Sequence, residues 1–457
     1  MADHLAILSQ SILSLLEEKK YSSLRDILTT MNPSDIAALF SGLKEDRIPL
    51  LFRLLPKEIA ADTFVEMEPD AQELLIRGFS DSELKEVIDE LYVDDAVDIV
   101  EEMPANVVQR ILKQADPDMR KEINELLRYP ENSAGSLMTT EYVSLRPDMT
   151  VEESILRIRR QGVDKETIYT CYVTDNRKLI GLVTVKDLLL AEDDSAPISE
   201  IMEENVISVH TTDDQEEVAQ MFSKYNFLAL PVVDAENRMV GIVTFDDAMD
   251  VMEDEATEDM EIMAGMTPSE HTYLHSSPVE IWKNRIPWLL LLMVSATFTG
   301  QIINHFEHAL AAQAALTGFI PMLMDTGGNC GSQASVSVIR GISLKEIKFT
   351  DFFAVVWKEI RVAALCGLCL AVVCFCKIQL VDNLIFHSDI STMVALTVCI
   401  TMAFSVLIAK LVGSTLPLLV KQIGLDPAVM AAPLLTTVVD AISLLVYFAV
   451  ASALLHL

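Results

Sequence analysis

One carboxylate stands where a charged group is costly. Asp440 is the only charged residue of the apolar run 428–455, and Thr436 and Thr437 precede it by four and three positions. On a helix these three side chains share a face. An ionised Asp at the centre of a bilayer costs roughly 2.5–3.5 kcal/mol, and such residues usually mark ion pathways. The position indicates a cation pathway. The structural alternative is a carboxyl that is protonated or satisfied by a neighbouring hydroxyl.

A second polar motif interrupts another apolar stretch, in the segment 321–335. Its glycines Gly327, Gly328 and Gly331 allow a bend or a close approach to another helix, and they expose backbone carbonyls to a cavity. Asn329 lies among them. The motif supplies neutral oxygen and amide groups for an ion pathway.

The type of these ligands favours a hydrated dication. One carboxylate does not balance a 2+ charge, but two-fold pairing of the chain would bring two Asp440 side chains together. Mg²⁺ sheds its water reluctantly and needs few carboxylates, whereas Ca²⁺ takes more direct oxygen ligands. Zinc or copper would require His or Cys near Asp440, and the sequence has none there. We therefore expect a homodimer that handles Mg²⁺.

A run of acids precedes the first apolar span. Its members recur at spacings of three or four and share one helical face: Asp247, Asp250, Asp254, Glu258 and Glu261. Like charges at this spacing destabilise a helix by a few tenths of a kcal/mol per pair. A cation-responsive helix is one interpretation, and an acidic face in contact with water is the other.

The excess charge is confined to the part before the spans. The chain has 34 Lys or Arg and 68 Asp or Glu, residues 276–457 hold ten of each, and residues 1–275 therefore hold 24 and 58. This balance argues against a nucleic-acid partner. It predicts that residues 1–275 spread at low cation concentration and become compact when cations bridge their carboxylates.

Five apolar stretches are long enough to cross a bilayer. They are approximately 286–304, 312–338, 354–377, 391–412 and 428–455. The segments outside the spans that carry basic residues, including Lys283, Arg340 and Lys421, all lie on the side of residues 1–275, and the other loops between spans carry none. We count Lys410 among the residues that flank a loop. By the positive-inside rule the N-terminus is cytoplasmic and the C-terminus is extracytoplasmic.

The first 275 residues divide into a helical part and a repeat. Residues 1–131 show short helical periodicity, with prolines at expected helix starts, and predict an α-helical superhelix. In 132–252, LIGLVTVKDLL and MVGIVTFDDAM match each other, each as a strand that runs into a helix. The order β–α–β–β–α per copy resembles a pair of CBS domains. That resemblance implies a cleft for ATP or another adenosine nucleotide, with Asp187 and Asp247 on ribose hydroxyls. The alternative is that both acids only cap helices.

The whole chain also resembles the MgtE family of magnesium channels. The motifs that carry the resemblance are GGNCGSQAS at Gly327, GLDPA at Gly424, TTVVD ending at Asp440 and DEATEDM at Asp254. It implies a multi-domain α-helical membrane protein with a helical N domain at 1–131, tandem α/β CBS domains at 132–252, a connecting helix at 253–280 and a five-helix transmembrane domain at 281–457.

The resemblance also implies roles for particular residues. Members are homodimers with a central pore in which Asp440 binds Mg²⁺, Asn329 and the Gly328 carbonyl line the pore, and Asp426 stands at its cytoplasmic entrance. Thr436 and Thr437 join this set through the face they share with Asp440. Cytoplasmic Mg²⁺ would hold the pore shut by binding a set of acids: Glu58, Asp94, Asp95, Asp98, Asp246, Asp247, Asp250, Glu255, Glu258 and Asp259. Asp325, beside the glycines, has no role in this scheme.

These expectations describe a magnesium importer of the cell membrane that is not an enzyme. A broader transporter of Mn²⁺ or Co²⁺ is an alternative, as is a CBS-regulated membrane enzyme. An intramembrane metalloprotease would need H-E-x-x-H, which does not occur in the sequence. A passive membrane scaffold would leave Asp440 unexplained.

Overall fold

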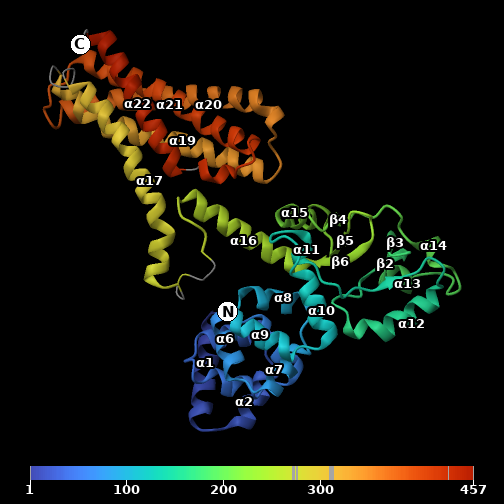
Figure 1. Cartoon of the computed structure of the whole chain (residues 1–457). Coiled ribbons are helices and arrows are strands. Elements are labelled where there is room, and N and C mark those ends of the chain that lie inside the picture. Colours follow the sequence, from blue (N-terminus) through green and yellow to red (C-terminus); the bar gives the residue numbers. More distant parts are fainter. Residues whose placement is uncertain (1, 270–272, 274–275, 308–312, 431, 456–457) are drawn as a thin grey trace. The chain divides into compact units, whose positions relative to one another are not determined.

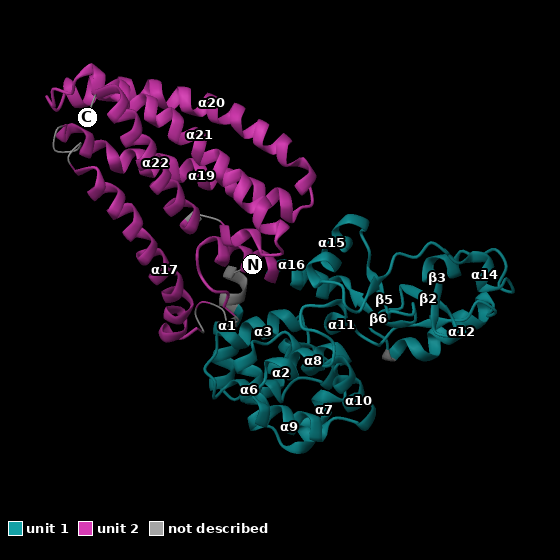
Figure 2. Cartoon of the chain, turned by 45° about the horizontal axis from the view of Figure 1, so that its top comes forward, with its two compact units in different colours: residues 1–253 teal, residues 254–457 magenta. Residues whose placement is uncertain are grey.

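The computed structural model describes residues 2–269, 273, 276–307, 313–430 and 432–455. The chain forms two compact units, Met1–Glu253 and Asp254–Leu457 (Figure 2). Each unit is described by itself. Helix α16 (Phe245–Met263) begins in the first unit and ends in the second.

The first part of unit 1 is helical, as the sequence predicts (Figure 1). Its helices are α1 (Ala2–Glu17), α2 (Tyr21–Leu28), α3 (Pro33–Ser41), α4 (Ile48–Phe52), α5 (Lys57–Val65), α6 (Pro69–Gly78), α7 (Asp81–Ile88), α8 (Val93–Glu102), α9 (Ala105–Gln114) and α10 (Pro117–Leu126). Alternate helices pack together, with α3 on α5, α5 on α7 and α7 on α9. Helices of two to three turns are too short to be stable alone, so this stacking is what buries their apolar faces.

Local sequence determines where these helices start. Pro33, Pro69 and Pro117 occupy the first helical turn, where a missing N–H costs nothing. The Asn32 side chain accepts a hydrogen bond from the Ser34 N–H at 3.1 Å. These starts agree with those expected from the sequence.

The second part of unit 1 contains the predicted repeat. One copy has β1 (Ser144–Leu145), α12 (Val151–Gln161), η1 (Gly162–Asp164), β2 (Thr170–Asp175), β3 (Lys178–Thr184) and α13 (Val185–Leu189). The other has β4 (Val209–His210), α15 (Gln215–Tyr225), β5 (Ala229–Val233), β6 (Met239–Thr244) and the start of α16, and short helices α11 (Ala134–Leu137) and α14 (Ile198–Ile201) precede the two copies. In each three-stranded sheet the first strand is parallel to the middle strand and the last is antiparallel to it.

The two copies interlock through matched residues. A Cβ on Gly181 would lie 2.6 Å from the Met202 Sδ, and one on Gly241 would lie 2.7 Å from the Met138 Sδ. Each glycine thus accepts the methionine that opens the other copy. Backbone hydrogen bonds join Thr139 to Ile242 and Glu203 to Leu182 beside these contacts. The small mixed sheets of the CBS pair are confirmed.

Unit 2 is a helical bundle with a core of its own. Its elements are α17 (Pro278–His305), η2 (Ala314–Phe319), α19 (Ile320–Ser343), η3 (Phe349–Asp351), α20 (Phe352–Lys377), η4 (Ile378–Asn383), α21 (Thr392–Gln422), η5 (Pro427–Met430) and α22 (Ala432–Leu455). Helix α19 packs on α21 and α22, and α21 also packs on α20.

Four of these helices, rather than five, are long and apolar enough to span a membrane within the described residues: α17, α20, α21 and α22. The second expected span corresponds to α19, whose glycines and polar side chains lower its hydropathy; residue 312, where that span was expected to begin, lies outside the described residues. The prediction for Lys410 is wrong. Helix α21 continues twelve residues past it, and Lys410 lies buried in the bundle instead of flanking a loop.

Candidate cation sites

The glycines of α19 bring this helix into close contact with α22. A Cβ on Gly327 would lie 2.8 Å from the Ser443 Oγ, and one on Gly328 would lie 3.1 Å from the Thr436 Cγ2 and 3.8 Å from the Asp440 Oδ1. The sequence motif around Gly327 and the TTVVD motif therefore meet. A larger residue at either glycine would separate the two helices, so the glycines are what allow Asp440 to lie against the α19 backbone.

The polar side chains at this contact differ in their burial and in the hydrogen bonds they make. Asp440 is half-buried, and the charge of Asp325 acts on it from α19. Thr436 and Thr437 both donate their hydroxyl protons to the Pro433 carbonyl, at 2.9 and 3.1 Å. Their oxygens keep lone pairs that can accept from water, while the Thr436 methyl group faces Gly328. The site offers one carboxylate with acceptor oxygens around it.

An exposed polar face continues along α19 from this contact. Asp325, Asn329, Gln333 and Ser337 recur every four residues, and all four are exposed. Side chains at this spacing lie one above another on a helix. Asn329 thus belongs to a stripe that includes Asp325, an acid for which the sequence analysis predicted no role.

A second group of carboxylates lies in unit 1, and we call it the acid cluster. Its members are Asp94, Asp95, Asp98, Glu141, Glu166, Asp246 and Asp247. The first three lie on α8 and the last two in the first turn of α16. Glu141 and Glu166 lie on two loops of the CBS pair. A hydrogen bond joins these loops, in which the Glu166 N–H donates to the Glu141 carbonyl at 3.0 Å. Five of the seven were predicted, and Glu141 and Glu166 were not.

The geometry of the acid cluster is suitable for a cation. Ligand oxygens of Asp94, Glu141 and Glu166 all lie within 4.8 Å of one another. Two ligands of one Mg²⁺ at about 2.1 Å are at most about 4.2 Å apart, so a slight contraction or retained water would complete the site. Asp94 is only 7 % exposed. Within the described part of the chain, its Oδ1 and the Glu166 Oε2 have no hydrogen-bond donor. A buried carboxylate in this state requires a proton or a cation.

The electrostatics agree with this interpretation. Desolvation and the charge of Asp247 raise the pKa of Asp95 to about 7, and desolvation with the charges of Asp94 and Asp95 raises the pKa of Glu166 to about 9. The pKa of Asp98 rises to about 8 for the same reasons, although its side chain keeps contact with solvent. For Asp94, burial and then the charge of Asp95 raise the pKa, and for Asp247, burial and then the charge of Asp94 raise it. The charges that raise these pKa values come from other carboxylates, so a dication would stabilise the cluster.

Two further predicted acids lie near the acid cluster or on its helix. Glu58 is exposed on α5, next to Asp62. Burial and the charges of Glu58 and Glu66 raise the pKa of Asp62, which in turn acts on Asp95. The structure therefore links Glu58 to the acid cluster only through Asp62, which sequence reasoning missed. Asp250 is exposed one turn beyond Asp246 and Asp247.

A third group lies in unit 2, at the end of α16. Burial, then the charges of Asp426, Glu255 and Glu258, raise the pKa of Asp259 to about 6. Asp426 begins η5 by accepting a hydrogen bond from the Ala428 N–H at 2.7 Å. The predicted pore-entrance acid thus lies beside the predicted acids of the connecting helix.

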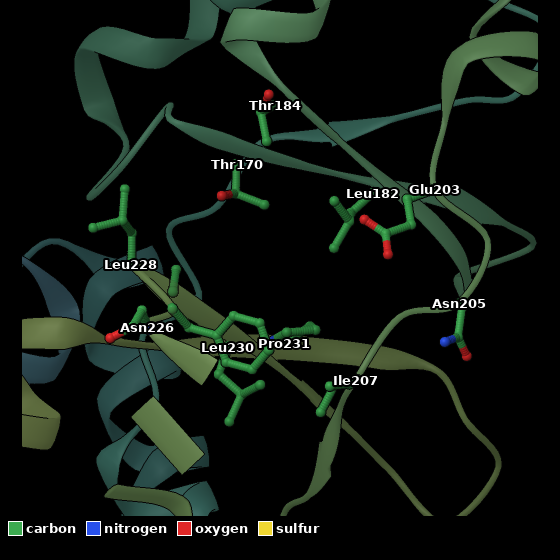
Figure 3. Close-up of a pocket in the computed structure, with 12 residues that line it drawn as sticks. Thr170, Leu182, Thr184, Glu203, Asn205, Ile207, Asn226, Leu228, Leu230 and Pro231 are labelled. Atoms are coloured by element: carbon green, nitrogen blue, oxygen red, sulfur yellow. The ribbon is translucent and has the colours of Figure 1, made fainter. Parts of the chain in front are cut away.

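The CBS pair contains a cavity between its two copies. It has a volume of about 300 Å³ and is lined by Thr170 and Thr184 from one copy and by Asn226 and Pro231 from the other (Figure 3). An adjoining cavity of about 500 Å³ shares Thr170, Thr184 and Leu228 and adds Lys186.

Neither acid predicted to bind ribose is among the residues that line these cavities. Asp187 accepts hydrogen bonds from the Thr184 N–H at 3.1 Å and hydroxyl at 2.5 Å, which is a helix cap. Asp247 accepts from the Thr244 hydroxyl at 2.5 Å and belongs to the acid cluster.

Known families match three parts of the chain. Residues 320–450 match the MgtE family of divalent cation transporters, residues 31–132 match the MgtE intracellular N domain, and residues 134–194 and 198–254 match CBS domains. Full-length relatives are also similar. The magnesium transporter MgtE of Thermus thermophilus is 37 % identical over 454 residues, covering 98 % of this chain and 99 % of the relative. That of Bacillus subtilis is 30 % identical and covers 97 % of each.

Solved structures agree for the part before the spans. The crystal structure of the cytosolic domain of the Mg²⁺ channel MgtE in complex with ATP is 40 % identical, with a TM-score of 0.51, and covers 53 % of this chain and 99 % of that one. The soluble part of a magnesium transporter is 32 % identical with the same TM-score, covering 55 % of this chain and 99 % of that one. With its helical N domain, CBS pair and apolar helices, the chain is a multi-pass membrane protein, and it belongs to the MgtE family of magnesium transporters.

Proposed function

We propose that the chain is a homodimeric channel that imports Mg²⁺ across the cell membrane. The observation that carries this proposal is the half-buried Asp440 of α22, held against the Gly328 backbone in a helix bundle that spans the membrane. Among the described residues Asp440 forms no salt bridge, and an intramembrane carboxylate in this state is suited to a passing cation. The full-length relatives described as magnesium transporters support the choice of ion.

Two-fold pairing would complete the pore site. Two Asp440 carboxylates balance one Mg²⁺. The Thr436 and Thr437 oxygens, the Gly328 carbonyl and the Asn329 side-chain oxygen would accept hydrogen bonds from the water shell of the ion. Mg²⁺ commonly keeps several waters when few carboxylates bind it. The exposed stripe on α19 supports this arrangement, because Asn329 and Asp325 are open to a second copy or to the pathway.

Cytoplasmic Mg²⁺ would close this channel by binding the acid cluster and the acids at the end of α16. The acid cluster includes Asp94, Asp95, Asp98, Asp246 and Asp247, with Glu58 and Asp250 as outer contributors. Helix α16 is continuous from Asp246 to Asp259, so it can transmit the state of one group to the other, where Glu255, Glu258 and Asp259 lie beside Asp426. Coupling is reciprocal, so a closed pore should raise the affinity of the cytoplasmic sites.

The cavity of the CBS pair would hold ATP or another adenosine nucleotide. Its apolar and hydroxyl lining is suitable for a base and a sugar, and Lys186 in the adjoining cavity is the cation there for phosphates. The relative crystallised with ATP supports this assignment. Asp187 would then act by holding Thr184, rather than by the ribose contact expected from the sequence.

We place residues 1–275 in the cytoplasm, because the loops between the spans that carry basic residues lie on their side. A broader substrate range remains the second candidate, since the family that matches residues 320–450 is described as transporting divalent cations. Mn²⁺ and Co²⁺ have radii and ligand preferences close enough to pass a carboxylate pair.

The test is flux into liposomes that contain a magnesium-sensitive dye and the purified protein. Asp440→Ala should abolish Mg²⁺ entry. Asp440→Asn keeps the size of the side chain but removes its charge, and it should lose most of the Mg²⁺ entry. Mn²⁺ and Co²⁺ are measured in parallel with suitable dyes. Wild-type flux in Asp440→Ala protein of normal elution profile would overturn the proposal.

A further inference from the structure

Unit 2 contains a buried ion pair that the proposed pathway does not use. The Lys410 Nζ on α21 lies 3.7 Å from the Glu359 Oε2 on α20. Lys410 is only 5 % exposed, and the Glu359 side chain is 14 % exposed. Both residues belong to helices that are long and apolar enough to span the membrane. Ionisable residues in this position are rare and usually functional.

This pair lies directly behind the helix that carries the glycine motif. One turn after Lys410, a Cβ on Gly413 would collide with the Gly331 carbonyl oxygen of α19, and the Ala409 carbonyl oxygen lies 3.2 Å from where a Cβ on Gly331 would be. Lys410 therefore lies, along α21, between two residues that contact α19 closely.

Helix α19 is thus held on two sides. Gly331 meets α21, while Gly327 and Gly328 meet α22 beside Asp440. Contacts of this closeness transmit displacement, because packed glycine faces leave no flexible side chain to absorb it. A rotation of α21 would move α19, and with it the distance between Gly328 and Asp440.

The packing of α20 against α21 does not depend on the ion pair alone. A Cβ on Gly367 would lie 3.3 Å from the Ala403 Cα, and Cys374 of α20 and Cys399 of α21 both belong to the apolar core of the bundle. Replacing a buried ion pair by apolar residues is often neutral or stabilising, whereas removing one partner leaves a costly unpaired charge. The best attested use of such pairs is to fix register.

From these contacts we infer that Lys410 and Glu359 form a positioning pair for the cation pathway. The pair fixes the rotation of α21 against α20, and the Gly413–Gly331 contact passes that position to the pore helix α19. The pair is also neutral as a whole, so the ammonium behind α19 does not repel a dication in the pathway. This inference rests on the proposed function.

The test measures initial Mg²⁺ flux against Mg²⁺ concentration for the full-length protein in liposomes. Glu359→Gln leaves an ammonium behind α19, and it should raise the half-saturating Mg²⁺ concentration by roughly fivefold. Lys410→Met leaves a carboxylate and should shift it in the opposite direction. A purely structural role would lower the yield of folded protein without moving half-saturation in opposite directions. The matched control is Lys377→Met, which breaks the pair between Lys377 and Asp382 (2.8 Å) at the other end of α20 and should leave half-saturation within about twofold.

The double variant Lys410→Met/Glu359→Gln decides the matter if the single variants do not fold. It buries no charge, so it should fold, keep half-saturation near the wild-type value and lose at least roughly two thirds of maximal flux because α21 is no longer fixed. Wild-type flux in the double variant, or single variants that shift half-saturation in the same direction, would overturn the inference. Asp440→Ala is assayed beside them. If it keeps flux, the proposed function fails; if it alone abolishes flux, only the positioning pair fails.

Discussion

The Oδ1 of Asp440 lies 3.8 Å from the point that a Cβ on Gly328 would occupy. One residue belongs to α22 and the other to α19, and 112 positions separate them in the chain. A carboxylate and a bare backbone therefore face one another inside a helix bundle. This relationship makes the spacing between the two helices a measurable property of the proposed pore.

Gly328→Ala tests that spacing. The new methyl group would lie 3.1 Å from the Thr436 Cγ2, which is closer than ordinary contact, so α19 and α22 must separate slightly. Overpacking of this kind typically costs about 1–3 kcal/mol. We expect Mg²⁺ flux to fall severalfold in the liposome assay while the protein still folds. Gly300→Ala is the control, because a Cβ there meets nothing within 4 Å. Equal flux in both variants would contradict the role of the contact.

Asp325→Asn tests the acid that the sequence left without a role. Asp325 is exposed on the same α19 stripe as Asn329, and its charge acts on Asp440. Loss of one charge should raise the half-saturating Mg²⁺ concentration roughly threefold to tenfold, given an effective dielectric constant of about 20. The effect should be smaller than that of Asp440→Asn and should shrink at high salt. An unchanged concentration dependence would exclude Asp325 from the pathway.

Sequence periodicity predicted the elements well, because their causes are local. Prolines at helix starts, the matched strand–helix segments of the CBS pair and the apolar runs each follow from neighbouring residues. The meeting of the Gly327 motif with Asp440 was also accessible, since small residues and an acid in membrane helices both require a partner. The number of apolar spans was harder to predict from the sequence. Helix α19 contains the glycines and polar residues of the Gly327 motif, and these lower its hydropathy.

The site residues that the sequence analysis did not predict correctly depend on contacts between segments far apart in the chain. Glu141 and Glu166 join the acid cluster only because a backbone hydrogen bond connects two loops. Lys410 was misplaced because its burial depends on how far α21 continues and on Glu359 of α20. Asp247 matched Asp187 in the repeat, yet it lies near the carboxylates of α8 and does not line the cavity of the CBS pair.

Glu166→Gln tests the part of the acid cluster that the sequence did not predict. Glu166 and Asp94 offer ligand oxygens within 4.8 Å of each other and of Glu141. Loss of this carboxylate should raise the internal Mg²⁺ concentration that half-inhibits flux by roughly tenfold, with maximal flux unchanged. Glu192→Gln, at an exposed position of the same CBS copy, is the control. Inhibition at the wild-type concentration would mean that Glu166 holds no regulatory cation.

The acid cluster also predicts how stability depends on pH in the absence of divalent cations. Burial and neighbouring carboxylates raise the pKa of Asp95 to about 7 and of Glu166 to about 9, well above the value near 4 of an unfolded chain. A raised native pKa means that the folded state binds more protons, so its stability falls as pH rises through that pKa. The melting temperature of unit 1, measured by calorimetry on the full-length protein in chelator, should therefore fall between pH 6 and pH 9. Saturating Mg²⁺ should largely remove this fall, because the cation replaces the protons that the carboxylates lose.

The double variant Asp94→Asn/Glu166→Gln should show a flatter pH profile in chelator, and Mg²⁺ should raise its melting temperature less than that of the wild type. A melting temperature that rises with pH, or that Mg²⁺ leaves unchanged at pH 8–9, would show that these carboxylates neither repel one another nor bind the ion.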